Sequence, residues 1–338
     1  MAVIVEKGGA LTTIQDSGRF GYEKYGLSTS GPMDWDAFQL ANILVGNEPN
    51  TSALEITVLG PTLRFDAPAV IAVTGGDLSF AINGQTADRC KAIAVVAGDE
   101  VSFGMPISGC RAYMAFAGGL DIPQVLGSCA TDPRYKIGGY QGRRLEKGDV
   151  LQLKQTVSTL PNMAMRRTEP MGVSDGPRKI RVIMGPQDDR FTEQGVSDFQ
   201  SGIYTVSKDS DRMGYRLQGP VIEHTTDGNI ISDGIAIGSI QVPSDGQPII
   251  MMADHQTVGG YTKIATVITV DLPLVGQCKA GDQLGFEIIS VDEAQSLLAA
   301  RRKELRELRE RLAMPEKEPQ RYRVQVNDLT FVIQLEEC

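Results

Sequence analysis

The chain has 338 residues, 37 of them glycine, and its formal net charge is −9 at pH 7. An acidic chain lacks the basic face that binds phosphates, so nucleic acid is excluded as a general partner. No apolar run approaches the roughly 20 residues of a membrane span, and five scattered cysteines without a C-x-x-C pair exclude a zinc-finger site and indicate the reducing cytoplasm.

A polar loop followed by a helix is predicted near the N-terminus. Asp16 and Arg19 lie among glycines, which permit tight turns and a close approach of the backbone to a ligand. Between 34 and 45 the apolar residues then recur with a helical period. Either Ser30 or Asp34 is a suitable N-cap for this helix.

Short apolar runs separated by turns follow the helix and predict strands. Asn83 and Gly84 lie between two of these runs and form a strong hairpin signal. Strands this dense, with short connections, indicate a closed barrel or a sandwich, because both hide sheet edges. The strands are expected at 53–59, 69–74, 78–82, 93–97, 101–103 and 112–117.

A short sequence echo occurs three times, at 97–103, 147–153 and 280–286. Each copy has a Gly-Asp pair followed by alternating apolar residues, which predicts a turn leading into a strand. We interpret the echo as a trace of two related β-barrel halves. Gly-Asp is also a common turn on its own, so coincidence remains an alternative.

Composition divides the chain into parts. Residues 156–178 contain three prolines and little periodicity, which is typical of a linker. The sequence therefore predicts a first β-barrel half at 1–155, this linker, a second β-barrel half at 179–290 and a C-terminal extension at 291–338.

Helices are expected at only two places beyond the linker. A short helix is expected within 188–200, and a charged amphipathic helix within 292–312. After it, 322–337 is a hairpin candidate in which Tyr322 opposes Ile333. We expect this extension to pack against the chain's own barrel rather than against a partner.

Familiar catalytic motifs are absent from the sequence. There is no G-x-x-x-x-G-K-[ST] phosphate loop, no G-x-G-x-x-G after a strand and no G-x-S-x-G elbow. Only His224 and His255 are histidines, which excludes a His-rich metal site and confines any His-based triad to these two.

The densest group of polar side chains lies between 210 and 263. Arg212 either holds a carboxylate or phosphate bidentately or braces a turn with a neighbouring aspartate. Asp254 follows the apolar run 248–253 and either acts as a base, orients a water or caps the turn. If that strand persists, His255 points away from Asp254, so the two do not enter one pocket.

Further candidates have equally open interpretations. Gln241 is suited to reading an amide, or it is a satisfied polar core residue. Tyr261 and Lys263 share a strand face, and Lys263 either neutralises developing negative charge or lies in solvent. Asp16 and Arg19 either join the same site or pair with each other.

Five stretches are long enough to compare with known families: IQDSGRFGYEKYGLSTSGPMD (14–34), ALEITVLGP (53–61), SDRMGYRL (210–217), GSIQVPSDGQPI (238–249) and ADHQTVGGYTKIA (253–265). Together they resemble the family formed by the C subunits of prokaryotic 5-oxoprolinases, also described as the allophanate hydrolase subunit 2 or biotin-dependent carboxyltransferase domain family. The resemblance covers residues 3–290. It implies a mainly β fold of two cyclophilin-like β-barrel domains with few short helices, to which the C-terminal helix and hairpin are added.

The resemblance also implies an activity. It points to a hydrolase acting on a cyclic amide: an ATP-dependent 5-oxoprolinase that opens 5-oxoproline (pyroglutamate) to L-glutamate in a complex with subunits B and A. Phosphorylation of the lactam oxygen by ATP would make the ring carbon susceptible to attack by water. Under this hypothesis the catalytic residues are Asp254, Arg212 and Lys263. The substrate-binding residues are Gln241, Gln256, Tyr261, Asp16 and Arg19.

Two alternatives come with the same resemblance. One is carboxyl transfer from carboxybiotin to urea or a similar amide; the chain has no Met-Lys-Met site, so biotin is expected on another polypeptide. The other is a non-catalytic, regulatory binding role. We favour the oxoprolinase because the sequence contains no carrier or ligase domain. One departure from the family pattern is Val258, which replaces a threonine and removes a hydroxyl.

Overall fold

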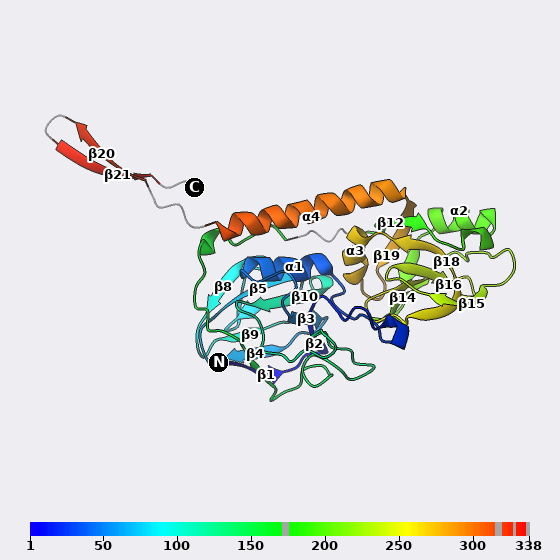
Figure 1. Ribbon diagram of the computed structural model, residues 1–338, viewed down its shortest axis with the longest axis horizontal. Helices are drawn as coiled ribbons and strands as arrows, with labels where there is room; N and C mark the ends of the chain where they lie inside the picture. The colour runs from blue at the N-terminus through cyan, green and yellow to red at the C-terminus, as the bar shows by residue number, and fades with distance from the viewer. Residues whose placement is uncertain (171–175, 315–319, 327–328, 336–338) are drawn as a thin grey trace.

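The computed structural model describes residues 1–170, 176–314, 320–326 and 329–335. They form a mainly β structure, as predicted, in which two β-rich halves lie side by side and a long helix crosses both (Figure 1). Among these residues, every helix is too short or too polar to span a lipid bilayer.

The first half contains two antiparallel sheets. One has six strands in the order β11 (Val150–Gln152), β1 (Ala2–Lys7), β4 (Thr62–Phe65), β9 (Glu100–Ser102), β6 (Ala81–Ile82) and β7 (Gln85–Thr86). The other has five strands in the order β2 (Leu11–Gln15), β3 (Ala53–Thr57), β10 (Ser108–Phe116), β5 (Ala69–Asp77) and β8 (Ala92–Val95). The predicted hairpin at Asn83 and Gly84 is confirmed, since Ile82 pairs with Gln85.

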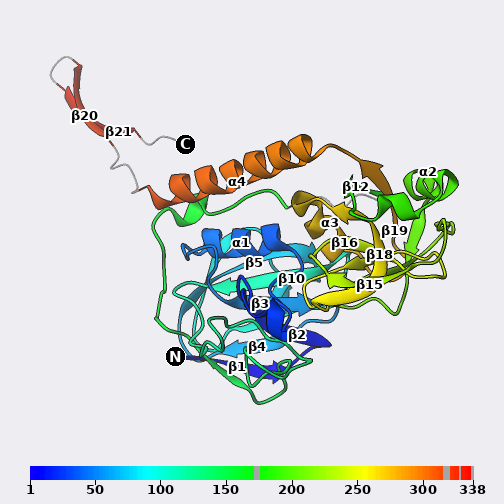
Figure 2. The ribbon, with the colours of Figure 1, turned by 45° about the vertical axis from the view of Figure 1, so that its right-hand side comes forward.

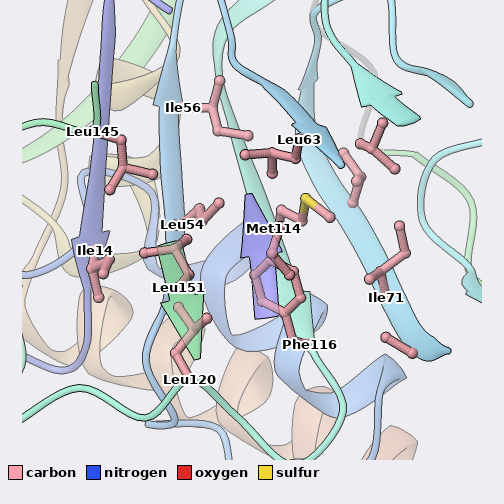
Figure 3. Packing of buried hydrophobic residues seen from close by; sticks show 14 of the residues in the cluster. Ile14, Leu54, Ile56, Leu63, Ile71, Met114, Phe116, Leu120, Leu145 and Leu151 are labelled. Atoms are coloured by element: carbon pink, nitrogen blue, oxygen red, sulfur yellow. The ribbon is translucent and has the colours of Figure 1, made fainter. Parts of the chain in front are cut away.

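The core of the first half lies between these sheets. Leu54 and Ile56 of β3 point into it together with Met114 and Phe116 of β10 (Figure 3). Since successive side chains of a strand alternate in direction, Glu55 points to the opposite face. That face is covered by α1 and the second half, so β3 is buried on both sides.

The second half is a closed barrel of seven strands, with β15 (Asn229–Gly234) added outside the ring along β18. A pairing between β12 and β18 closes the ring. Its strands follow the order β12 (Arg178–Met184), β19 (Gln283–Ile288), β13 (Tyr204–Val206), β14 (Gly214–Gln218), β17 (Ile249–Met251), β16 (Ser239–Val242) and β18 (Val258–Val267).

The helices are short apart from the last one. They are α1 (Trp35–Leu44), α2 (Glu193–Ser201), α3 (Leu272–Gly276) and α4 (Val291–Ala313), with 3-10 turns η1 (Glu23–Tyr25), η2 (Met163–Met165), η3 (Asp188–Arg190) and η4 (Thr269–Asp271). Of the two predicted caps of α1, Asp34 is the one used, because its Oδ1 accepts a hydrogen bond from Ala37 N at 2.9 Å.

Helix α4 packs on the chain itself, as expected. Arg301 forms an ion pair with Asp36 of α1 at 2.8 Å, and Leu305 and Leu312 are buried against the same helix. The hairpin strands β20 (Gln320–Val326) and β21 (Leu329–Leu335) have the predicted register, with Tyr322 opposite Ile333. They extend away from the body of the molecule in both ribbon views (Figures 1 and 2), so the expectation that the extension packs against the chain's own barrel holds for α4 and is wrong for the hairpin. The predicted turn at 327–328 lies outside the described residues.

The sequence echo corresponds to a repeated turn. Gly98, Gly148 and Gly281 have φ values of 94°, 92° and 89°, which favour glycine. Their backbone N–H groups each donate to a strand carbonyl, at 2.8, 2.8 and 2.9 Å. The turns lead into β9, β11 and β19, so the same local structure occurs in both halves.

Candidate functional site

Arg212 lies between the two halves and is 5% exposed. Its Nε donates to Asp254 Oδ2 at 2.8 Å, and its Nη2 donates to Asp254 Oδ1 at 3.0 Å. Nη2 also donates to the Gly31 carbonyl at 2.7 Å, and Nη1 pairs with Glu55. The guanidinium therefore holds a carboxylate bidentately, as one interpretation of the sequence proposed, but that carboxylate belongs to the protein itself.

Charge balance favours the ionised forms of Glu55 and Arg212. Burial would raise the pKa of Glu55, but the charges of Arg212 and Arg111 outweigh burial and hold the pKa below its usual value. Burial would lower the pKa of Arg212, but Asp254 and Glu55 outweigh it and the pKa rises. Two carboxylates from different halves thus share one buried cation.

Asp254 is the member of this network with an unusual proton affinity. Burial raises its pKa, and the charge of Arg212 offsets only part of that effect. The Ser30 hydroxyl donates to Asp132 Oδ2 at 3.5 Å and acts to lower the pKa of Asp254, as Arg212 does. A buried carboxyl with a raised pKa, fixed at a domain boundary, has the properties of a general base.

The orientation predicted for His255 rested on a strand that is not there. Strand β17 ends at Met251, and Asp254 and His255 lie in the turn that follows. Strand alternation therefore does not apply to these two side chains, and the prediction that they point apart loses its basis. The His255 Nδ1 atom is 2.8 Å from the Gln256 carbonyl, and burial lowers the pKa of His255.

Two glutamine amides converge on Gly259 of β18. A Cβ atom added to Gly259 would lie 2.8 Å from Gln241 Nε2 and 3.6 Å from Gln256 Nε2. Gln241 is 1% exposed, and its Nε2 has no hydrogen-bond partner among the described residues. An unsatisfied buried amide is costly, so Gln241 Nε2 is an available hydrogen-bond donor.

Lys263 lies on β18, four residues after Gly259. Its Cα is paired with that of Gln241 across β16 and β18. The residue is 3% exposed, and its Nζ donates to Asp233 Oδ2 at 2.7 Å and to the Gly234 carbonyl at 3.1 Å. Lys263 is thus not solvated, and its counter-ion comes from the outer strand β15. Tyr261, two residues earlier, is 39% exposed.

Asp16 and Arg19 do not form an ion pair in the described structure; each has other partners. Asp16 Oδ1 accepts from Gly18 N at 2.9 Å and from Ser128 Oγ at 2.6 Å, and Oδ2 accepts from Cys129 N at 2.5 Å. These bonds brace two loops. Burial lowers the pKa of Arg19, although nearby Asp132 and Asp16 oppose that effect.

Sequence reasoning missed Glu55 and Asp132. Glu55 is a carboxylate inside an otherwise apolar run, which is a signal for a buried ion pair that could have been used. Asp132 is 1% exposed, accepts from Ser28 Oγ at 2.9 Å and contributes to the raised pKa of Asp254. It lies in a loop without periodicity, so only the fold reveals that it is close to Asp254.

The structure thus brings the candidates together in two neighbouring groups. Arg212 and Asp254 lie at the boundary between the halves. Gln241, Gln256 and Lys263 lie around β18, and Asp254 and Gln256 are two residues apart in one turn. Among the described residues, no set of three His, Cys, Asp or Glu side chains is arranged to hold a metal ion.

Comparison with known proteins places this geometry in context. The pattern of the family described as "Carboxyltransferase domain, subdomain A and B" matches residues 25–288. The chain is 37% identical over 290 residues to the C subunit of 5-oxoprolinase from Escherichia coli (strain K12), covering 85% of this chain and 91% of that protein. It is 38% identical over 287 residues to the C subunit of 5-oxoprolinase from Haemophilus influenzae, covering 84% and 90% of the two chains.

A solved structure is also similar. The crystal structure of the K. lactis urea amidolyase superposes with a TM-score of 0.83 at 36% identity. The match covers 91% of this chain but 20% of that one. The similarity to the urea enzyme therefore concerns one part of a much longer protein.

Proposed function

This chain belongs to the family of carboxyltransferase domains with subdomains A and B, and we propose that it is a subunit of an ATP-dependent 5-oxoprolinase. The observation that carries the proposal is the extent of the match: the alignment covers 91% of the C subunit of 5-oxoprolinase from Escherichia coli but 20% of the urea amidolyase chain. The proposed reaction is the opening of 5-oxoproline to L-glutamate in the cytoplasm, in a complex with subunits A and B.

The reaction must activate a stable amide. In the proposed sequence of steps the γ-phosphoryl group of ATP is transferred to the lactam oxygen, with release of ADP. A first water attacks the ring carbon and the carbon–nitrogen bond of the ring breaks, which leaves the new carboxyl group as an acyl phosphate. A second water hydrolyses this acyl phosphate to the carboxylate and inorganic phosphate. The nitrogen takes up a proton and becomes the amine of glutamate. We assign no ATP site to this chain, because the nucleotide is proposed to bind with a partner subunit.

The site residues are proposed to divide this work. The amides of Gln241 and Gln256 donate to the lactam oxygen near Gly259, where an unsatisfied N–H group is available. Asp254, with its raised pKa, orients or deprotonates the attacking water. The ammonium of Lys263 stabilises the negative charge that develops on the reacting oxygens. To do so it exchanges its hydrogen bond with Asp233 for one with these oxygens. Arg212 acts as a positioning residue, since its hydrogen bonds hold Asp254.

The proposal is tested by substrate-dependent ATP hydrolysis in the assembled complex. We expect 5-oxoproline to stimulate ATP hydrolysis and the release of one glutamate per ADP. Variants Asp254→Asn and Gln241→Leu in this chain are expected to lower that turnover while leaving assembly intact. If both variants keep the wild-type turnover in a verified complex, the chemistry does not take place at this site.

A second candidate is carboxyl transfer to urea or a similar amide. It is favoured by the TM-score of 0.83 with the urea amidolyase. It requires a carboxybiotin carried by another polypeptide, and it predicts bicarbonate-dependent rather than 5-oxoproline-dependent ATP hydrolysis. Adding a biotin carrier with urea in place of 5-oxoproline distinguishes the two.

A further inference from the structure

Arg19 is a buried cation that forms no ion pair in the described part of the chain. The residue is 1% exposed. Nε donates to the Val125 carbonyl at 3.0 Å, and Nη2 donates to the Ala130 carbonyl at 2.9 Å. Nη1 is buried and has no hydrogen-bond partner in the described part of the chain. A guanidinium removed from water costs free energy unless an anion or a full set of acceptors compensates it.

Two other buried arginines show what such compensation looks like. Arg212 is shared by two carboxylates. Arg166 donates to the carbonyls of Leu44 and Leu312, in the last turns of α1 and α4, where the helix dipoles supply partial negative charge. Arg19 has neither arrangement. The two carbonyls that accept its hydrogen bonds belong to a loop, and Nη1 has no acceptor among the described residues. The free nitrogen is therefore unexplained by the fold alone.

The surroundings of Arg19 limit the anion that it accepts. Asp132, Asp16 and Asp254 are close enough for their charges to act on the guanidinium. A phosphate, with a charge near −2, would be repelled by three carboxylates, whereas a carboxylate adds a single negative charge. The two N–H groups of Nη1 suffice to bind one carboxylate. The same aspartates place this anion near Asp254, the proposed general base.

Access to Arg19 is provided by the segment that follows it. None of the residues 20–27 is buried, and Phe20 and Tyr25 are 64% and 70% exposed. The base of this loop is closed by a hydrogen bond from Arg19 N to the Thr29 carbonyl at 2.7 Å. A loop with so few buried contacts opens at low free-energy cost, so a small ligand can reach the guanidinium at its base.

We propose that Arg19 Nη1 receives the carboxylate of the substrate, so that the site selects small amides bearing a carboxylate over neutral amides such as urea. The identification of 5-oxoproline as the best-fitting member of this class rests on the proposed function. Arg19 is then a specificity-determining residue, and Asp16 is a structural brace rather than a substrate contact.

The test uses equilibrium binding to the full chain, measured by calorimetric titration. Three probes are compared: 5-oxoproline, 2-pyrrolidinone, which is the same lactam without the carboxylate, and glutarate, which is a carboxylate without the lactam. One charge-assisted contact predicts that 5-oxoproline binds about 10- to 100-fold more tightly than 2-pyrrolidinone. In Arg19→Gln this difference should disappear, and in Arg19→Lys it should be partly retained. Arg64→Gln, at an exposed ion pair, is the matched control.

The outcomes separate this inference from the proposed function. If glutarate or 5-oxoproline binding depends on Arg19 but the assembled complex does not turn over 5-oxoproline, the anion site stands and the oxoprolinase proposal falls. Equal affinities for the two lactams overturn the inference. So does a folded Arg19→Gln that binds 5-oxoproline like the wild type, or the absence of carboxylate-dependent binding for every probe. If Arg19→Gln fails to fold, the inference is tested by Arg19→Lys and by the affinities of the wild type for 5-oxoproline and 2-pyrrolidinone.

Discussion

Arg212 and Asp254 form a bidentate ion pair, with Nε–Oδ2 and Nη2–Oδ1 distances of 2.8 and 3.0 Å, in a place where neither residue is more than 7% exposed. The same guanidinium binds Glu55 of the first half. One side chain thus joins the two halves and fixes the carboxylate that we propose as the base. We therefore expect substitutions of Arg212 to lower both the stability of the protein and its activity.

Removing this cation takes the bidentate partner from the buried Asp254 carboxylate and leaves Glu55 with Arg111 as its remaining arginine. We predict that Arg212→Met destabilises the protein by about 3–5 kcal/mol, the usual effect of breaking a buried pair from one side. Arg64→Met, which breaks an exposed pair with Glu6, should cost less than about 1 kcal/mol. Urea denaturation monitored by circular dichroism gives both values. If both variants lose similarly little free energy of unfolding, Arg212 does not stabilise the contact between the two halves.

Gly259 and Gly260 form a matched pair for testing the two amides. A Cβ at Gly259 would lie 2.6 Å from Ile235 Cδ1 and 2.8 Å from Gln241 Nε2, so alanine must displace the amide. At Gly260 the nearest atom would be 3.4 Å away, an ordinary contact. We predict that Gly259→Ala lowers the turnover of 5-oxoproline at least about tenfold more than Gly260→Ala does. Equal effects in the complex would argue against a role for Gln241.

Neutralising Asp254 should affect chemistry more than assembly. Asp254→Asn is predicted to lower kcat by about 10²–10⁴, the usual contribution of a general base. Assembly should persist, because Arg212 retains its pair with Glu55. Size-exclusion chromatography of the complex serves as the control for assembly. A variant that assembles and keeps its kcat would remove Asp254 from the mechanism.

The stability of the chain should vary with pH through Asp34. Burial raises the pKa of Asp34 from 3.8 to about 6, so the folded state favours the protonated form. The stability contributed by this proton is fully present below pH 3.8 and is lost as the pH rises through about 6, a change of about 3 kcal/mol.

Asp34→Asn removes this titration. Its Oδ1 still accepts from Ala37 N, but its amide N–H₂ faces Gln277 Nε2, so the variant carries a cost that does not vary with pH. We predict that the stability difference, wild type minus variant, falls by about 3 kcal/mol between pH 4 and pH 7. Urea unfolding across this range measures it. A constant difference would contradict the raised pKa.

Local features of the fold were accessible from the sequence. The helix at 34–45 was predicted to within a residue, because its apolar period and its cap at Asp34 are encoded in adjacent residues. The Gly-Asp turns were accessible for the same reason, since a left-handed glycine such as Gly98 marks its own position. These signals need no knowledge of distant contacts.

Long-range relationships were not accessible in this way. The pairing of β12 with β18 closes the barrel across about 80 residues, and no local pattern specifies it. The partners of Arg212 come from three separate segments, so the sequence left its role open between ligand binding and bracing. The end of β17 at Met251 depends on its neighbours in the barrel, so the sequence could not show whether strand alternation applies to His255.

The most direct test of the account is the formation of glutamate from 5-oxoproline and ATP by subunits A and B, with this chain present or omitted. The account predicts glutamate production with all three components, none without this chain, and a strong loss with Asp254→Asn in its place. Glutamate production that is unchanged when this chain is omitted, or none at all in a verified three-part complex, would contradict it.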